Sequence, residues 1–260
     1  MTFQLTFCQQ AGNKHKKNQD ALFNGKAVYQ WQLKNAESDI LDRENVIFGV
    51  ADGVSHSPQS QIASRFLMEQ LSKCQSLNST WLRATQFALC EKYAASHFGI
   101  SSTFVGCELH ANGKGKILNV GDSRAYKIMA NGEWQQLSEE HTVLNEMKMQ
   151  GLAQDPAEYA SIYRALSDCI IADVEAADFR IHSAEFQLEK GESILLCSDG
   201  LHDYLKPKEL EMIWQGYSCN AERLQICRKS VKKHRLYDDL SVVVCEMGAT
   251  QHDTICHINP

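Results

Sequence analysis

Five aspartates stand at the edges of apolar segments, where a strand would end and a cleft could begin. They are Asp20, Asp52, Asp122, Asp199 and Asp238. If these strand ends converge, the carboxylates repel one another unless a cation neutralises them. Oxygen ligands suit Mg²⁺ and Mn²⁺, whereas zinc prefers the His and Cys that these positions lack. Aspartates are also good turn formers, so the spacing by itself leaves turn residues and metal ligands as open alternatives.

The segments between these aspartates predict strands grouped with strands and helices grouped with helices. Apolar periodicity of 3.6 residues predicts a helix that carries Ile62, Phe66, Leu67 and Leu71 on one face, and further helices at about 79–98, 142–150, 155–166, 207–215 and 220–233. Alternating or continuous apolar runs predict strands at 2–8, 46–51, 102–109, 116–121, 124–130, 133–138, 178–188, 192–198 and 240–247. The Asn131-Gly132 turn favours antiparallel pairing. Such grouping favours helices outside antiparallel sheets over alternating βαβ units.

Composition narrows the class of protein. The 260 residues contain four prolines and no Gly/Ser-rich linker, which favours one compact domain. A net charge of −6 disfavours nucleic-acid binding, and no run approaches the roughly 18 apolar residues of a membrane span. The ten cysteines form no C-x-x-C pair, and several lie in apolar runs, as reduced buried thiols do. We therefore expect a cytoplasmic monomer that binds neither nucleic acid nor membrane.

An ordered series of short motifs adds what spacing cannot supply. The series is Asn18-Gln19-Asp20, Asp52-Gly53, Asn119–Arg124, Glu139–Thr142, Ser198-Asp199-Gly200 and Asp238–Ser241. From about residue 5 to 247 it resembles the metal-dependent protein serine/threonine phosphatases of the 2C type, in their compact bacterial form. The resemblance implies an α+β fold, a four-layer α-β-β-α sandwich of two antiparallel sheets flanked by helices. It also implies a catalytic domain over 1–247, with a flap at about 142–178, and a loose tail at 248–260.

The resemblance further implies a centre of two divalent cations, Mg²⁺ or Mn²⁺, that bridge the attacking water. By similarity, Asp52 would bridge both ions, and the Gly53 carbonyl would assist. Asp52 and Asp199 would act in catalysis through this water, which attacks phosphorus in line without a covalent intermediate. Two cations about 3.5–4 Å apart lower the pKa of such a water and hold the phosphoryl oxygens. Phosphoryl transfer of this kind needs no Ser or Cys nucleophile, so Cys197 is expected in the core.

The remaining aspartates take supporting roles in the same comparison. Asp20 would serve one ion, mostly through waters, while Asp199 and Asp238 would serve the other. Asp122 would join Asp199 at a weaker third ion. The full implied metal set is Asp20, Asp52, Gly53, Asp122, Asp199 and Asp238.

Several positions depart from the family pattern. Gln19 replaces a glutamate of many relatives, and Val54 replaces a histidine proposed as general acid in some. His15 replaces the arginine that often grips the substrate phosphate, and histidine is a weaker, pH-dependent anion binder. The surrounding basic cluster could attract a phosphoryl group or simply be solvated, and the same alternatives hold for a histidine in the altered loop after Asp52. The candidate phosphate contacts are Lys14, His15, Lys16 and His56.

The predicted function is Mg²⁺- or Mn²⁺-dependent hydrolysis of phosphoserine and phosphothreonine in proteins, in signal transduction. The family suggests phosphorylated protein substrates, among them a Ser/Thr kinase or that kinase's target. The alternative is a non-catalytic, phosphatase-like module that binds phosphoproteins or a kinase partner, favoured by the loss of the arginine and the altered loop. An aspartyl-phosphate mechanism would require a D-x-D motif after the first strand, which Asn18-Gln19-Asp20 does not supply.

Overall fold

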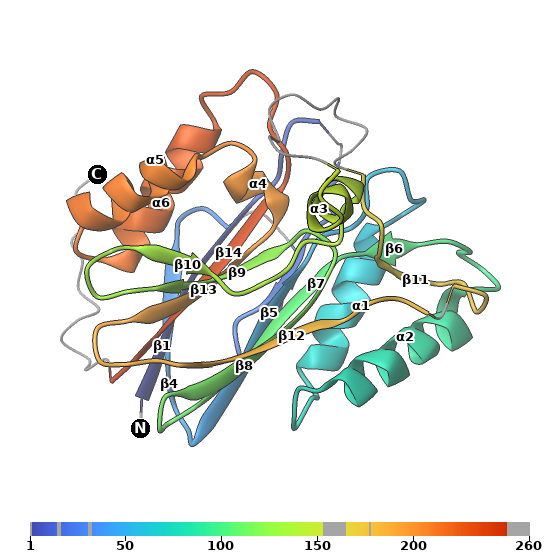
Figure 1. Ribbon diagram of the computed structural model, residues 1–260, viewed down its shortest axis with the longest axis horizontal. Coiled ribbons are helices and arrows are strands. Elements are labelled where there is room, and N and C mark those ends of the chain that lie inside the picture. Colours follow the sequence, from blue (N-terminus) through green and yellow to red (C-terminus); the bar gives the residue numbers. More distant parts are fainter. Residues whose placement is uncertain (1, 15–16, 31–32, 153–164, 177, 249–260) are drawn as a thin grey trace.

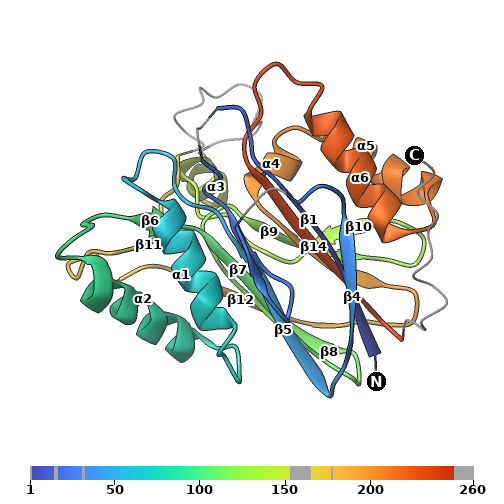
Figure 2. The same ribbon diagram turned by 180° about the vertical axis from the view of Figure 1, so that it is seen from behind.

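Two antiparallel sheets lie face to face, and helices cover both outer faces (Figures 1 and 2). The structure is a computed structural model that describes residues 2–14, 17–30, 33–152, 165–176 and 178–248. Its layers confirm the predicted α-β-β-α sandwich.

Each sheet has six strands, all paired antiparallel. The first runs in the order β10 (Trp134–Gln136), β9 (Arg124–Ile128), β13 (Ser193–Cys197), β14 (Leu240–Met247), β1 (Thr2–Gln10) and β4 (Glu37–Asp42). The second runs in the order β12 (His182–Gln187), β8 (Lys114–Val120), β7 (Phe104–His110), β5 (Asn45–Ala51), β2 (Ala21–Phe23) and β3 (Val28–Tyr29). A separate two-stranded ladder joins β6 (Ser101–Ser102) and β11 (Ile170–Ile171).

Helices pack on the two outer faces in separate groups. The second sheet is covered by α1 (Gln61–Leu71) and α2 (Ser79–Tyr93), and the first by α4 (Asp199–His202), α5 (Pro207–Gly216) and α6 (Asn220–Val231). The short α3 (Val143–Met149) lies near one end of the sandwich (Figure 1). The Asn78 side chain caps α2 by accepting the Trp81 N–H, and Pro207 begins α5, where a missing N–H costs nothing.

Three apolar clusters separate the four layers. Strand β5 shows how alternation builds two of them, because successive side chains point to opposite faces. Phe48 lies fully buried between the sheets, whereas Ile47 and Ala51 lie under the helices. Gly49 lets α1 approach, since a Cβ there would lie 2.5 Å from a methyl carbon of Leu71. The third cluster lies under α5 and α6.

Some predicted elements differ from the structure. Helix α2 ends at Tyr93 rather than near 98, and the very short β2, β3 and β11 were not predicted. The predicted helix at 155–166 and the tail at 248–260 lie outside the described residues, apart from 165–166 and Gly248. Among the described cysteines, eight are free thiols and Cys219 is disulfide-bonded, an exception to the expected reduced state. No described helix has the length and apolar character needed to cross a membrane.

Candidate metal centre

The five predicted aspartates all lie at one end of the sandwich. Asp52 follows β5, Asp122 follows β8 and Asp199 follows β13, while Asp20 precedes β2 and Asp238 precedes β14. Antiparallel pairing brings these strand ends to the same edge of each sheet. This is the end near which α3 and α4 lie in Figure 1.

The pKa values of these carboxyls are raised first by burial and then by neighbouring negative charges. Burial raises the pKa of Asp52 well above its ordinary value, and the charges of Asp20, Asp199 and Asp122 raise it further. Burial likewise raises the pKa of Asp199, with added repulsion from Asp122 and Asp238. The Asp52 side chain is close enough to Asp20 and Asp199 for their charges to raise its pKa. The chain therefore gathers several carboxyls that cannot all be ionised comfortably without a compensating cation.

Asp20 is the most deeply placed member of the group. Its side chain is fully buried, and the Ser198 hydroxyl donates to Oδ2 at 2.7 Å. Its other oxygen, Oδ1, is buried and accepts no hydrogen bond from the described residues. Burial, with the charge of Asp239, raises the pKa of Asp20 to about 8. A buried carboxylate oxygen of this kind fits a role toward a cation or its water.

Asp122 lies among acidic neighbours, of which Glu140 belongs to the ordered motifs and Asp203 does not. Burial raises its pKa to about 7, and the charges of Glu140 and Asp203 contribute to this. Arg124 opposes them and forms an ion pair with Glu140, while its Nη1 donates to the Tyr126 hydroxyl at 2.9 Å. Asp203 had no sequence signal beyond being an acid one helical turn after Asp199.

The loop after β5 is held by residues that sequence reasoning missed. The Asp52 N–H donates to Thr103 Oγ1 at 3.0 Å, and the Thr103 N–H donates back to the Asp52 carbonyl at 2.8 Å. The Gly53 N–H donates to the Gln19 carbonyl at 3.1 Å. A Cβ at Gly53 would lie 2.8 Å from that oxygen, so glycine allows the close approach. These backbone contacts fix the Asp52 carboxylate beside Asp20.

Ser57 anchors the next part of this loop. Its hydroxyl donates to the Gly99 carbonyl at 3.1 Å and accepts the Ser101 N–H at 2.8 Å. The candidate phosphate contact His56 precedes it and is exposed to solvent.

The donor atoms of the five strand-end aspartates indicate which metal they could hold. Among the described residues, no three His, Cys, Asp or Glu side chains surround one point closely enough to form a finished cage. The acidic side chains instead act on one another through their charges, and they offer oxygen donors only; Asp20 Oδ1 is buried without a hydrogen-bond partner among the described residues. We give weight to the donor chemistry, because repelling carboxylates close around a point only when a cation compensates them. Oxygen donors of this kind suit Mg²⁺ or Mn²⁺.

Comparison with known proteins decides the family. The profile described as "Protein phosphatase 2C" matches residues 16–240, which is most of the chain. The chain belongs to the protein phosphatase 2C family. This confirms the resemblance that the ordered motifs indicated, and with it the prediction of a protein phosphatase.

The following relatives and solved structures resemble this phosphatase domain. The serine/threonine phosphatase stp of Listeria monocytogenes is 26% identical over 222 residues, which cover 78% of this chain and 84% of the relative. The solved serine/threonine phosphatase PstP/Ppp of Mycobacterium tuberculosis is similar with a TM-score of 0.75 at 17% identity, covering 96% of this chain and all of that one. The solved serine/threonine phosphatase Stp1 of Staphylococcus aureus is similar with a TM-score of 0.72 at 19% identity. The match covers 94% of this chain and 95% of that one. The catalytic domain of a serine/threonine phosphatase PstP, solved in complex with two manganese ions, is similar with a TM-score of 0.71 at 18% identity. The match covers 95% of this chain and 99% of that one.

Lys14 is the member of the phosphatase's basic cluster that the structure places next to the carboxylates. Lys14 Nζ lies 3.0 Å from Asp238 Oδ2 and 5.5 Å from the centre of the Tyr204 ring. Burial lowers the pKa of Lys14, but hydrogen bonds with Tyr204 and Asp238 outweigh it and raise the pKa above its ordinary value. The other two cationic candidates, His15 and Lys16, lie outside the described residues.

Arg180 binds the stem of the predicted flap, by which we mean the described flap residues 142–146 and 165–168. Its Nε donates to Asp168 Oδ2 at 2.7 Å and its Nη2 donates to Ser167 Oγ at 2.8 Å. It also pairs with Glu146 on α3, on the other side of the stem. Beside it, His141 accepts the Gly121 N–H at 3.2 Å through Nδ1, and its carbonyl accepts the Ser167 N–H. The stem therefore connects to the turn that carries Asp122.

Replacing Arg180 with glutamine should loosen this stem without unfolding the domain. Partly exposed ion pairs contribute roughly 0–1 kcal/mol each, so we expect Tm to fall by only about 1–3 °C. Hydrogen exchange of the Val143 and Ser167 amides, which bond across the stem, should quicken about five-fold. The control is Arg65→Gln, which breaks an ion pair with Glu69 on α1. Unchanged exchange at both stem amides would refute a holding role for Arg180.

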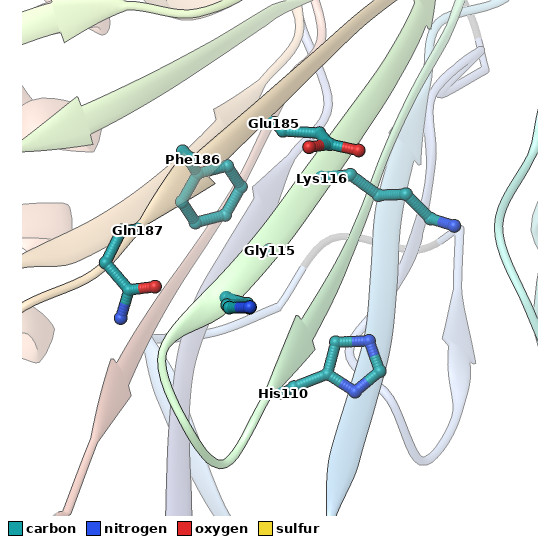
Figure 3. Close-up of a pocket in the computed structure, with 7 residues that line it drawn as sticks. His110, Gly115, Lys116, Glu185, Phe186 and Gln187 are labelled. Atoms are coloured by element: carbon teal, nitrogen blue, oxygen red, sulfur yellow. The ribbon is translucent and has the colours of Figure 1, made fainter.

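A separate pocket lies at the opposite end of β8 from Asp122 (Figure 3). It has a volume of about 510 Å³, and its lining includes Lys114, Lys116 and Phe186. Asp122 lies six positions after Lys116 along the chain, or about 20 Å at the spacing of a strand. Lys116 is paired there with the buried Glu108 at 3.3 Å. The pocket is therefore not part of the acidic cluster.

Proposed function

We propose that this chain is a Mg²⁺- or Mn²⁺-dependent phosphatase that hydrolyses phosphoserine and phosphothreonine in proteins. The observation that carries the proposal is the meeting of the strand-end aspartates at one end of the sandwich, where the charges of Asp20, Asp122 and Asp199 raise the pKa of Asp52 and those of Asp122 and Asp238 raise the pKa of Asp199. Family membership and the names of the relatives support it. We assign the activity to residues 1–247, with a flap at 142–178, and to a monomer in the cytoplasm.

The residues proposed to hold two divalent ions, with Asp122 toward a weaker third, are Asp20, Asp52, the Gly53 carbonyl, Asp122, Asp199 and Asp238. When bound, the ions would supply an activated water and positive charge for the phosphoryl oxygens. The charges of Asp20 and Asp199 both act on Asp52, which supports a role for its carboxylate toward both ions. Ser198 fixes the Asp20 carboxylate, and Thr103 fixes the Asp52 backbone.

The phosphoryl group of the substrate needs positive charge from the chain as well. Lys14 is the candidate that the structure describes next to the centre, 3.0 Å from Asp238. His15 and Lys16 follow it in the sequence and would strengthen the local positive potential. His56 is exposed on the loop after Gly53 and could reach a bound phosphoprotein from there.

A cysteine mechanism has no support at this site. Cys197 precedes Ser198-Asp199, but its side chain is fully buried. Burial raises the pKa of its thiol to about 12, and a nucleophilic cysteine requires the thiolate. The proposed reaction therefore proceeds without a covalent cysteinyl intermediate.

The proposal predicts metal-dependent turnover by the purified chain. We expect hydrolysis of p-nitrophenyl phosphate and of phosphoserine and phosphothreonine peptides with Mn²⁺, a fall of at least about 100-fold in EDTA, and recovery when Mn²⁺ is restored. Phosphate release from each peptide is the measurement, and a phosphotyrosine peptide is the matched comparison. Equal rates with and without EDTA would contradict a metal mechanism.

The alternative is a non-catalytic module that binds phosphoproteins or a kinase partner. The observation that favours it is the histidine at position 15, a weaker anion binder than arginine. Calorimetry separates the two functions. Tight phosphopeptide binding without turnover at saturating Mn²⁺ would support the module, whereas turnover would support the enzyme, with a Ser/Thr kinase or its target as the expected substrate.

A further inference from the structure

The segment that carries the basic cluster is docked on the residues just before β14. We call the described residues 12–14 and 17–19 the basic loop. The Asn13 N–H donates to the Tyr237 carbonyl at 3.0 Å, and the Tyr237 N–H donates to Asn13 Oδ1 at 2.9 Å. Asn13 Nδ2 donates to the Arg235 carbonyl at 3.0 Å. Gly12 packs so closely that a Cβ would lie 2.5 Å from the carbonyl carbon of Asp238.

One carboxylate closes the basic loop at both ends. Asp239 is 4% exposed; its Oδ1 accepts the Gly12 N–H at 2.7 Å and its Oδ2 accepts the Gln19 N–H at 2.6 Å. Burying a carboxylate is costly unless its oxygens are satisfied, and hydrogen bonds to an ionised acceptor are among the stronger ones. Asp239 therefore holds the two ends of the basic loop together from a buried position.

The two ends of the basic loop both lead to the acidic cluster. At one end, Lys14 follows the docked Gly12 and Asn13, and its Nζ lies 3.0 Å from Asp238 Oδ2. At the other end, the Gln19 carbonyl accepts the Gly53 N–H, and the next residue is Asp20. The two hydrogen bonds that Asp239 accepts from the basic loop thus determine where Lys14 lies relative to the carboxylates of the acidic cluster.

We infer that Asp239 is a positioning residue that fixes the basic loop so that Lys14 meets the phosphoryl group of the substrate beside the metal centre. The inference rests on the proposed function, and it gives Asp239 no role as a metal ligand. Asp239 acts through Lys14, so its loss weakens phosphate binding more than it slows the chemical step. Asparagine is the informative replacement, because it keeps one acceptor oxygen and presents an NH₂ group to the other N–H.

The test is a double-mutant cycle of Asp239→Asn and Lys14→Met in the full chain with Mn²⁺. The readouts are the Kd of inorganic phosphate by calorimetry, KM and kcat for p-nitrophenyl phosphate, and the Kd of Mn²⁺. We expect each single variant to weaken phosphate binding and raise KM about ten-fold, with kcat changed less than three-fold. In the Lys14→Met background, Asp239→Asn should add less than two-fold, because coupled residues are not additive.

The control is Asp39→Asn, which alters a carboxylate bonded to Asn24 and Lys26. It should leave the phosphate Kd within two-fold. Full additivity of the two variants, or a fall in kcat and Mn²⁺ affinity at unchanged KM, would overturn the inference, because Asp239 would then act on the metal side. A thermal melt identifies an unfolded variant, in which case Asp239→Ser repeats the test. If the wild type binds phosphate but does not turn over, the proposed function fails while the phosphate Kd still tests Asp239.

Discussion

Replacing Asp52 with asparagine is expected to lower kcat at saturating Mn²⁺ by about 10³-fold, a loss of several kcal/mol of transition-state stabilisation. The reason is position, since the charges of both Asp20 and Asp199 act on the Asp52 carboxyl. Asparagine has the same shape and keeps the backbone bonds to Thr103, but it removes one anionic oxygen. The loss should therefore fall on catalysis and metal affinity rather than on folding. Steady-state rates on p-nitrophenyl phosphate and a phosphothreonine peptide are the measurement.

The same variant should be more stable than the wild type when no metal is present. Repulsion from Asp20 and Asp199 disfavours an ionised Asp52, and asparagine removes this cost. An increase of about 1 kcal/mol in the free energy of unfolding raises Tm by roughly 2–4 °C in a domain of this size. Asp39→Asn, away from the cluster, is the matched control for both readouts. A variant with a rate within three-fold of the wild type would show that Asp52 is not central to the reaction.

The strand-end aspartates could be predicted because strands and turns have local signatures. Alternating and continuous apolar runs mark strands such as β5 and β14, and the ordered motifs identify the family that brings their ends together. The short β2 has three residues, too few for a period to be visible. The fold class thus followed from pattern and resemblance, while the exact strand complement did not.

The residues that hold the aspartates in place could not be predicted in the same way. Thr103 supports Asp52 from 51 positions away, and Ser198 supports Asp20 from 178 positions away. Asp239 bonds Gln19 from 220 positions away. Such contacts form only when the sheets are assembled. The spacing of residues along a short stretch of sequence therefore cannot predict them. A serine or threonine beside a strand reads the same whether its hydroxyl supports a carboxylate or faces solvent.

Without divalent ions, the protein is expected to lose stability as the pH rises from about 4 to 8. The folded pKa is raised to about 7 for Asp122 and about 8 for Asp20, from an ordinary value of 3.8. Burial is the largest cause for both. Since the native state then binds more protons than the unfolded chain, stability falls with pH. The favourable contribution is complete below about pH 4 and disappears as the pH passes through 7 to 8.

The size of this effect makes it measurable by thermal melts in EDTA. Each factor of ten in proton affinity is about 1.4 kcal/mol, so the two carboxyls together imply a loss on the order of several kcal/mol, reduced by the partial solvent access of Asp122. Asp122→Asn and Asp20→Asn should each flatten the pH dependence. A Tm that stays constant from pH 5 to 8.5, or that rises with pH, would contradict the crowding of carboxyls at this end of the sandwich.

Mn²⁺ should reverse the same pH dependence, which links stability to the proposed function. A cation that compensates the carboxylates favours their ionised forms, so folded pKa values fall and the high-pH penalty disappears. Binding to the native state also stabilises it, by about 2.7 kcal/mol at 100 times Kd. The shift in Tm on adding Mn²⁺ should therefore be larger at pH 8.5 than at pH 5.5, because protons compete for the same oxygens at the lower pH. An equal shift at both values would mean that Mn²⁺ binds elsewhere.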